Sequence, residues 1–499
     1  MLTKLTSFAT IGLHGEKIDV EVATARGDTR MIIVGLGDTA VKESEQRVKM
    51  ALRSSGFRFP TGHIVTVNLA PADLRKVGPR YDVSMALGIL IVTGSLIVPD
   101  EKIASMAFLG ELALDGRLRH VSGVLPAAIA CRKQGIKTIV VPKANGPEAA
   151  LIPDIEVIAV ENLAELVAIL SGQKESEHFE APASSPAHLP TDVVDFADVR
   201  GQEHVKRALE IAAAGGHNVL LSGAPGAGKT LLARALRGIL PPLSQEESIE
   251  VSQIYSVANL LPSNSPLVTV RPFRIVHHTA SGVSIVGGGQ VPGPGEISLA
   301  HRGVLFLDEL AEFPSQVLEV LRQPLEDRTI TITRAQGSVT FPADFIMVAA
   351  MNPGKYAAGG DIRIKRRISQ PLLDRIDLTI DVRPVAIEDL QRAPREGTET
   401  SAAILGRVVQ ARKVQAARFK KLSITTNKEM NVKHIDTLCT LNVESQQLLK
   451  AAVERMGLSA RGYHRTIKVA RTIADLAASE GIETGHVAEA LQYRQNIGE

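Results

Sequence analysis

The chain of 499 residues is too long for a single hydrophobic core, so we expect two to four domains. Its 44% apolar and 22% charged residues are ordinary for a globular protein, and the net charge of only +2 argues against a protein that coats nucleic acid by charge alone, although it leaves room for local basic patches. Cys131 and Cys439 are its only cysteines, which excludes a disulfide framework and a cysteine-rich zinc site.

The first residues show no basic segment followed by an apolar one, so we expect no secretory signal. The longest apolar runs, such as that at 84–98, are too short and too often interrupted by glycine to span a bilayer. We therefore predict a cytoplasmic protein with no membrane partner.

Residues 1–171 mix strand-like runs with helical patterns and are predicted to form an α+β N-terminal domain. The stretch VKESEQRVKMALRSSG at 41–56 repeats apolar positions at helical spacing and ends at a glycine. The next segment, 172–192, is rich in Pro, Ser, Ala and Glu and has almost no large apolar residues, so it cannot bury a face against a core. We interpret it as a linker.

Beyond the linker, two regions differ in their patterns. Between 193 and 385, the strand-like runs at 218–223, 304–309 and 345–352 alternate with helical segments, which is typical of a parallel α/β sheet. From 386 to 499 the strand signals disappear, and helices closed by glycine or polar turns follow one another. We predict an α/β core over 193–385 and a helical lid domain over 386–499.

The first chemical motif is a glycine-rich loop that follows a predicted strand and opens a predicted helix. It matches G-x-x-x-x-G-K-T in full, and its residues are Gly223, Ala224, Pro225, Gly226, Ala227, Gly228, Lys229 and Thr230. In such a loop, backbone N–H groups surround the β-phosphate of ATP, Lys229 reaches the β- and γ-phosphate oxygens, and Thr230 holds Mg²⁺. A glycine-rich turn that matches by chance is the alternative, and the strand–loop–helix context argues against it.

Two predicted buried strands end in polar residues that would complete an ATPase. The strand VLFL is followed by Asp308, which would coordinate Mg²⁺ through water, and by Glu309, which would act as general base on the attacking water. Asn352 ends the next buried strand and would orient that water or sense the γ-phosphate. Taken alone, an Asp-Glu pair at a strand end is more often only a strand end, and the upstream loop favours the catalytic interpretation. For Asn352, a turn-forming Asn before Pro353 is an alternative that the sequence leaves open.

Three arginines are candidates for sensing ATP. Arg375 lies in LLDRID, where an ordinary salt bridge competes with the role of an arginine finger that reaches the ATP of a neighbouring subunit and so requires a ring. Arg461, at the head of a predicted lid helix, could contact the γ-phosphate, and Arg465 is the second choice. A surface arginine without a catalytic role is the alternative for both.

A predicted β-hairpin interrupts the series of catalytic strands. The sequence TITITRAQGSVTF has alternating β-branched residues on both arms and a turn that begins at Arg334 and closes at Gly337. A second insertion, GGGQVPGPGE at 287–296, is too rich in glycine and proline to be a helix or a central strand.

In this order, the glycine-rich loop, LFLDE, AAMN, LLDRID and SARGYHRTIKVARTIADL resemble the magnesium-chelatase-like branch of the AAA+ ATPases. Within that branch, RPFRIVHHTASGVSIVGGGQVPGPGEISLAHRGVLFLDEL resembles the bacterial YifB/ComM proteins, and the resemblance covers nearly the whole chain. It implies a hexameric ring that uses ATP and Mg²⁺ to move along single-stranded or branched DNA and promotes branch migration while transforming DNA is integrated. The alternative is a chelatase-type motor that remodels a protein partner.

The same resemblance implies a role for the two insertions. They correspond to the helix-2 insert and the pre-sensor hairpin of this branch, which project toward the central channel of the ring. We therefore predict that Arg334 contacts a DNA backbone there, with a solvated turn residue as the alternative. After AAMNP, relatives carry a cysteine cluster; this chain has Lys365, Arg366 and Arg367 instead, which form either a second DNA-facing patch or a solvated loop, and without thiolates a zinc site there is excluded.

The N-terminal domain resembles the catalytic domain of Lon protease through FLGELALDGRLRHVSGVLPAAIACRKQGIKTIVVPK and KVGPRYDVSMAL. Arg80 stands where that family has its catalytic serine, and Leu125 lies near the position of its lysine, so the resemblance implies a non-proteolytic domain. Arg75, Lys76 and Arg80 are predicted to form either a basic loop for DNA or a purely structural loop.

His277 and His278 are adjacent in an extended stretch, where neighbouring side chains point to opposite faces. Because no carboxylate lies close to them in sequence, we do not expect them to share a metal ion. The only metal predicted is the Mg²⁺ bound with ATP.

Overall fold

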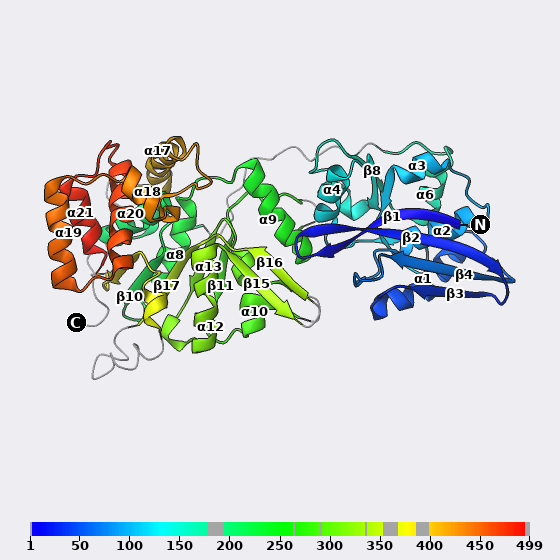
Figure 1. Cartoon of the computed structure of the whole chain (residues 1–499), viewed down its shortest axis with the longest axis horizontal. Coiled ribbons are helices and arrows are strands. Elements are labelled where there is room, and N and C mark those ends of the chain that lie inside the picture. The colour runs from blue at the N-terminus through cyan, green and yellow to red at the C-terminus, as the bar shows by residue number, and fades with distance from the viewer. Residues whose placement is uncertain are drawn as a thin grey trace. The chain divides into compact units, whose positions relative to one another are not determined.

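The computed structural model of the chain describes residues 2–177, 179, 193–262, 265–289, 292–334, 337–352, 368–385 and 399–494. The chain divides into two compact units (Figure 1), of which one comprises Met1–Pro186 with Gln245–Val268 and the other Ala187–Ser244 with Thr269–Glu499. Among the described residues, no helix is long and apolar enough to cross a membrane.

The described part of the first unit is built on one mixed sheet in the strand order β3-β4-β2-β1-β5-β8-β9. The strands are β1 Leu2–Ile11, β2 His14–Arg26, β3 Arg30–Val34, β4 His63–Ala70, β5 Met106–Phe108, β8 Thr138–Pro142 and β9 Glu156–Val160. In β4, Val65, Val67 and Leu69 are fully buried, and the residues between them are only partly covered. This two-residue alternation is what a strand with one core-facing side requires. A short hairpin, β6 Glu111–Leu112 with β7 Leu118–Arg119, lies apart from the sheet.

Helices of the first unit pack against this sheet. They are α1 Thr39–Ser54, α2 Asp82–Val92, α3 Asp100–Ala104, α4 Val124–Lys133, α5 Gly146–Ala149 and α6 Leu163–Leu170. The helix predicted at 41–56 is α1, which begins after the N-cap Asp38, whose carboxylate accepts from the Val41 N–H. Its chain then leaves through Gly56 at φ 87°, a left-handed conformation that favours glycine.

Helix α9 (Gln245–Val257) belongs to the first unit, although in sequence it falls within the range expected for the α/β core. It packs on α4, and the Ser256 hydroxyl donates to the buried carboxylate of Glu148. The Gly123 N–H donates to the Ser256 carbonyl over 3.2 Å. No sequence pattern indicated that α9 belongs to the first unit, because polar contacts between distant segments leave no periodic signal in the sequence.

The second unit contains the predicted parallel sheet. Among the described residues, its strands run in the order β11-β14-β17-β10-β18, and every neighbouring pair is parallel. Their bounds are β10 Val219–Gly223, β11 Phe273–Val276, β14 Val304–Leu307, β17 Ile346–Met351 and β18 Leu378–Val382. All residues of β14 and β17 are buried, as expected for central strands covered on both faces.

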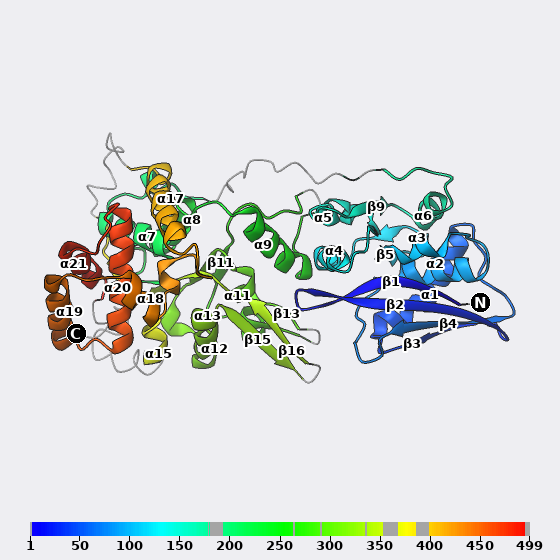
Figure 2. The ribbon, with the colours of Figure 1, turned by 45° about the horizontal axis from the view of Figure 1, so that its top comes forward.

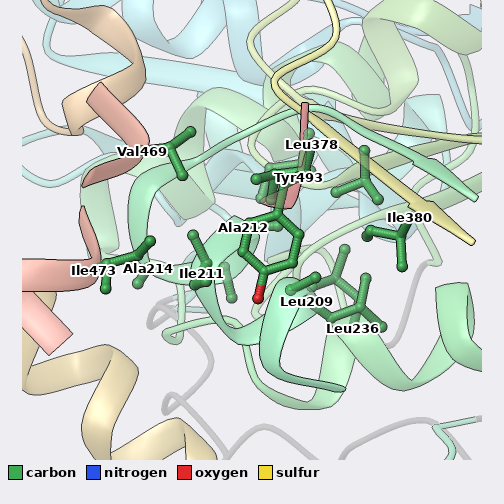
Figure 3. Close-up of a cluster of buried hydrophobic side chains, with 14 of the residues drawn as sticks. Leu209, Ile211, Ala212, Ala214, Leu236, Leu378, Ile380, Val469, Ile473 and Tyr493 are labelled. Atoms are coloured by element: carbon green, nitrogen blue, oxygen red, sulfur yellow. The ribbon is translucent and has the colours of Figure 1, made fainter. Parts of the chain in front are cut away.

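Helices cover this sheet and continue to the C-terminal end of the unit. They are α7 Glu203–Gly215, α8 Lys229–Gly238, α10 Gly282–Val286, α11 Glu296–Leu299, α12 Ser315–Val320, α13 Arg322–Asp327, α15 Gln370–Leu373, α17 Ser401–Arg418, α18 Val432–Leu438, α19 Val443–Met456, α20 Ala460–Leu476 and α21 Thr484–Gln492. One buried cluster joins α7, α8 and the helices from α17 to α21 to the sheet: Figure 3 shows Ala214 of α7 beside Ile473 of α20, and Leu378 of β18 above Tyr493. The predicted α/β class with a helical C-terminal region is confirmed.

Two small hairpins of the second unit lie outside its main sheet (Figure 2). They are β12 Gly287–Gly288 with β13 Gly293–Pro294, and β15 Thr329–Arg334 with β16 Gly337–Pro342. In β15, Ile330 and Ile332 are buried, whereas Thr331 and Thr333 face solvent and their hydroxyls meet those of Thr340 and Ser338 across the hairpin. The predicted hairpin is therefore present.

Candidate nucleotide-binding site

The carboxyl edge of the parallel sheet brings together residues that are far apart in sequence. The glycine-rich loop follows β10, the Asp308–Glu309 pair follows β14, and Asn352 follows β17. Because β10, β17 and β14 are neighbours in the sheet and point the same way, these ends meet at one edge. This edge is where open α/β sheets bind their ligands.

The glycine-rich loop has the backbone that its glycines predict. Gly226 and Gly228 have φ values of 80° and 87°, which side chains rarely tolerate. Gly223 is required for a different reason, since a Cβ there would lie 2.3 Å from the carbonyl oxygen of Val382 on β18. Helix α8 then begins at Lys229 with no side-chain cap on its first N–H groups. Those N–H groups and the helix dipole are suited to a phosphate.

Lys229 connects the loop to Asn352. Its buried ammonium donates to the carbonyls of Gly223 at 2.7 Å and Ala224 at 2.9 Å, and to Asn352 Oδ1 at 2.8 Å. Burial lowers the pKa of Lys229, and the carboxylates of Asp308 and Glu309 act in the opposite direction. The charge is therefore held at the sheet edge among acceptors that phosphate oxygens could replace.

Glu309 has a constrained backbone. Its φ of 53° is in the left-handed region, and its N–H donates to Asp308 Oδ1 at 3.0 Å. Non-glycine residues in this conformation cluster at functional sites, because the surrounding fold must impose it. Asp308 and the Thr230 hydroxyl offer the hard oxygen ligands that Mg²⁺ prefers, so the residues present fit a Mg²⁺–ATP complex.

Arg375 and Arg461 lie at the other edge of the sheet. Arg375 is buried and pairs with Glu326 at 2.5 Å, and Arg461 approaches the same carboxylate at 3.6 Å. The Arg375 carbonyl accepts from the side chain of Asn218, which precedes β10, whereas the glycine-rich loop begins at Gly223 beyond that strand. The rise of the chain through β10, from Asn218 to Gly223, separates the two edges by about 17 Å. Neither arginine therefore contacts its own chain's loop in this conformation.

Arg465 is part of a buried network at the same edge, which shares Asn218 with Arg375. Its guanidinium lies 3.5 Å from Asp377, which also accepts from the Asn218 N–H at 2.9 Å. Burial by itself would raise the pKa of Asp377, but Arg465 and His217 beside it hold that pKa well below its usual range. This anchoring favours a structural role for Arg465.

Arg334 is exposed at the end of β15 and lies against the other insertion. A Cβ built on Gly288 would be 2.8 Å from one guanidinium nitrogen of Arg334, and one built on Gly287 would be 2.7 Å from the side chain of Ile332. Because Gly287 and Gly288 carry no side chains, the two hairpins pack closely. Lys365, Arg366 and Arg367, predicted as a basic cluster, lie outside the described residues.

Two of the three residues in the predicted basic loop of the N-terminal domain are held by that domain, whereas Arg75 is exposed. Lys76 is fully buried and donates to the Pro71 carbonyl, and Arg80 donates to the Thr10 hydroxyl at 2.6 Å. The DNA-loop interpretation of these two residues is therefore wrong, because their charges are held by the domain's own acceptors. The structural alternative is correct for both.

The two premises behind the expectation for His277 and His278, that their side chains point to opposite faces and that no carboxylate is near, differ from the structure. Strand β11 ends at Val276, so the two histidines lie beyond the strand and need not alternate. Their ring centroids are 4.3 Å apart, and His278 Nδ1 is 3.1 Å from Glu309 Oε2. Sequence separation hid this carboxylate, which the strand order alone brings next to the pair.

Comparisons with known proteins cover both units. Three family descriptions match: "Magnesium chelatase, subunit ChlI" at 195–390, "Subunit ChlI of Mg-chelatase" at 20–145 and "Magnesium chelatase, subunit ChlI C-terminal" at 398–494. The chain is 42% identical to competence protein ComM of Haemophilus influenzae, with 98% of this chain and 97% of that protein aligned. It is 41% identical to the uncharacterized protein YifB of Escherichia coli, with 97% and 96% aligned.

A Lon protease of Rhizobium meliloti is 30% identical over 210 residues, which are 40% of this chain and 25% of that protein. Arg80, predicted to stand where Lon has its catalytic serine, donates to the Thr10 hydroxyl. At Leu125, predicted to lie near the position of Lon's lysine, the backbone N–H donates to Glu148 at 2.9 Å.

Proposed function

The chain belongs to the YifB/ComM family of magnesium-chelatase-like AAA+ ATPases, and on this premise we propose that it is an ATP-driven motor that moves DNA. The observation that carries the proposal is the contact of Lys229 with Asn352 beside Asp308 and Glu309. A lysine, a polar amide and two carboxylates at the mouth of a phosphate-binding loop are the groups that ATP hydrolysis uses.

Each residue has a chemical task in this proposal. Lys229 would bind the β- and γ-phosphate oxygens, Thr230 would hold Mg²⁺ directly and Asp308 would hold it through water, and the ion would supply positive charge against the phosphate oxygens. Glu309 accepts a proton from the attacking water, and Asn352 holds that water in line. Fixed donors at the sheet edge favour the transition state because they need no rearrangement when charge moves.

We propose that the active form is a homo-oligomeric ring, which by resemblance to the family is a hexamer. Arg375 and Arg461 share Glu326 at the edge of the sheet opposite to their own glycine-rich loop. Arginines in that position suit the ATP of a neighbouring protomer better than their own. On ATP binding, Arg375 would exchange Glu326 for the γ-phosphate of the neighbour.

We propose DNA as the polymer that the ring moves. Arg334 stands exposed at the end of a hairpin that the Gly287–Gly288 insertion supports from one side. One cation per protomer at equivalent positions suits a phosphate chain, which is contacted without regard to its bases. One relative is named a competence protein, and this supports a role in the integration of transforming DNA. The resemblance to the family adds branch migration as the form of that role.

The test is ATP hydrolysis with and without single-stranded, forked and duplex DNA. We expect single-stranded or forked DNA to raise the rate, and Arg334→Ala to retain ATP binding but lose most of the stimulation and the unwinding. In a plot of the logarithm of the DNA-binding constant against the logarithm of the salt concentration, the slope should also become shallower by about one for each lost phosphate contact. Arg455→Ala, at an exposed position on α19, is the matched control. Equal unwinding by both variants would refute the role of Arg334.

The second candidate is a motor that remodels a protein partner, and the magnesium-chelatase family descriptions favour it. It predicts ATP hydrolysis that no DNA stimulates. A rate unchanged by every DNA substrate, in a preparation that hydrolyses ATP, would therefore favour this candidate over the DNA motor.

A further inference from the structure

The His277–His278 pair and Glu309 lie at the ends of neighbouring strands. Strand β11 pairs in parallel with β14, and Val276 at the end of the first is opposite Leu307 at the end of the second. The chain continues from these positions into the two histidines and into the Asp308–Glu309 pair. The side chains that follow are therefore brought to the same place by strand pairing.

The three side chains can point one ligand atom each at a common position. These atoms, one from each of His277, His278 and Glu309, all lie within 4.8 Å of one another. The shortest separation is 3.1 Å, between His278 Nδ1 and Glu309 Oε2. Despite this proximity, the buried Nδ1 has no well-directed hydrogen bond to any described residue. A buried nitrogen beside a carboxylate oxygen, without a hydrogen bond between them, needs a cation or a proton to satisfy both.

His277 is prepared for binding in a similar way. Its Nδ1 lies 3.0 Å from the Thr279 hydroxyl, which orients the ring and leaves Nε2 for a ligand. Such a second contact on a ligating imidazole fixes its tautomer and orientation. The two imidazole rings are tilted by 36°, so their planes are not parallel.

We propose that His277, His278 and Glu309 form a binding site for a divalent transition-metal ion, with Zn²⁺ as the best fit. Two imidazoles and one carboxylate are a recurrent zinc donor set, and a fourth position stays open for water. Zinc–ligand bonds of about 2.1 Å place tetrahedral ligand atoms about 3.4 Å apart. Side-chain rotations that move the ligand atoms by about 1 Å would bring these three atoms to that spacing.

This site would compete with catalysis for Glu309. A carboxylate that coordinates a cation keeps other lone pairs, but the cation stabilises its negative charge and makes it a weaker base toward the attacking water. Zn²⁺ would thus slow hydrolysis while Lys229 and the loop still bind ATP, because the Mg²⁺ ligands Thr230 and Asp308 are different groups. The inhibitory effect rests on the proposed role of Glu309 as base, whereas binding of the ion does not.

Binding is tested first, on the full-length protein without nucleotide, using Co²⁺ as a coloured substitute for Zn²⁺. We expect visible absorption typical of a low-coordinate nitrogen and oxygen site. His277→Ala and His278→Ala should each weaken Co²⁺ affinity at least about tenfold. His120→Ala, at an exposed histidine in the other unit, should bind as the unaltered protein does. No absorption, or equal affinity in the His277→Ala variant, would overturn the site.

Inhibition is tested second, with saturating Mg²⁺–ATP and buffered Zn²⁺. Each variant is compared with its own rate without zinc, so that an effect of the substitution at His277 on hydrolysis itself cancels. We expect Zn²⁺ to inhibit the unaltered protein and His120→Ala at equal concentrations, and His277→Ala to require at least about tenfold more. Equal inhibition of all three proteins would refute the proposal that Zn²⁺ inhibits hydrolysis by binding at this site. If the protein hydrolyses no ATP, the proposed function fails, and the Co²⁺ measurement still decides the metal site.

Discussion

Replacing Arg375 with alanine separates the structural role of this residue from its proposed role in catalysis. Its side chain is only 4% exposed, pairs with Glu326 at 2.5 Å and donates to the Pro371 carbonyl at 2.6 Å. Within one protomer, these contacts describe an ordinary buried salt bridge. In the proposed ring, the same guanidinium would leave Glu326 and stabilise the γ-phosphate of a neighbouring ATP.

The two roles predict effects of different size. Glu326 is half exposed, so after loss of Arg375 it regains water, and we expect a stability loss of about 1–3 kcal/mol rather than the larger loss for a fully buried pair. Loss of an arginine finger lowers kcat by about 10³–10⁵, which is about 4–7 kcal/mol in the barrier. The effect on hydrolysis should therefore exceed the effect on folding.

The assay combines thermal unfolding, kcat at saturating Mg²⁺–ATP, and mixed assemblies. Arg375→Ala protomers retain Glu309, and Glu309→Gln protomers retain Arg375, so some interfaces in a mixture carry both groups. We expect each variant alone to be inactive and the mixture to recover part of the rate. A loss of less than about tenfold in kcat for Arg375→Ala, or no recovery in assemblies that native mass spectrometry identifies as mixed, would refute the finger.

Three further predictions concern the loop and the thiols. Gly223→Ala should lower stability by about 1–3 kcal/mol and weaken ATP binding, because the new Cβ would lie 2.3 Å from the Val382 carbonyl; an unchanged melting temperature would contradict this. Lys229→Ala should abolish ATP binding and hydrolysis, measured with a fluorescent ATP analogue and phosphate release, and hydrolysis that persists in a clean preparation would overturn the assignment. Burial raises the pKa of Cys131 to about 12 and that of Cys439 to about 11, so both should stay protonated and unreactive toward a thiol reagent at about pH 8 until the protein unfolds, and rapid labelling of the native protein would count against their burial.

Short sequence patterns predict a structural feature correctly where its physical cause involves only neighbouring residues. Gly226 and Gly228 have the positive φ values that the loop motif implies, and β15–β16 pairs across the turn that begins at Arg334. Backbone sterics and the two-residue period of a strand act over a few neighbouring residues, so a sequence expresses them directly. The polar residues that directly follow the strands VLFL and AAM were predicted in the same way.

Sequence patterns predict the elements and the chemical groups at their ends, including Lys229, Glu309 and Asn352. Which of these groups come into contact depends on how the whole chain folds. The pairing of β11 with β14 places Glu309 beside His278. Arg375 and Arg461 both approach the carboxylate of Glu326. Helix α9 packs on α4 and therefore belongs to the first unit. The reason is that strand order and helix docking follow from the sum of many weak burial terms over the whole fold, and no short stretch of sequence contains that sum.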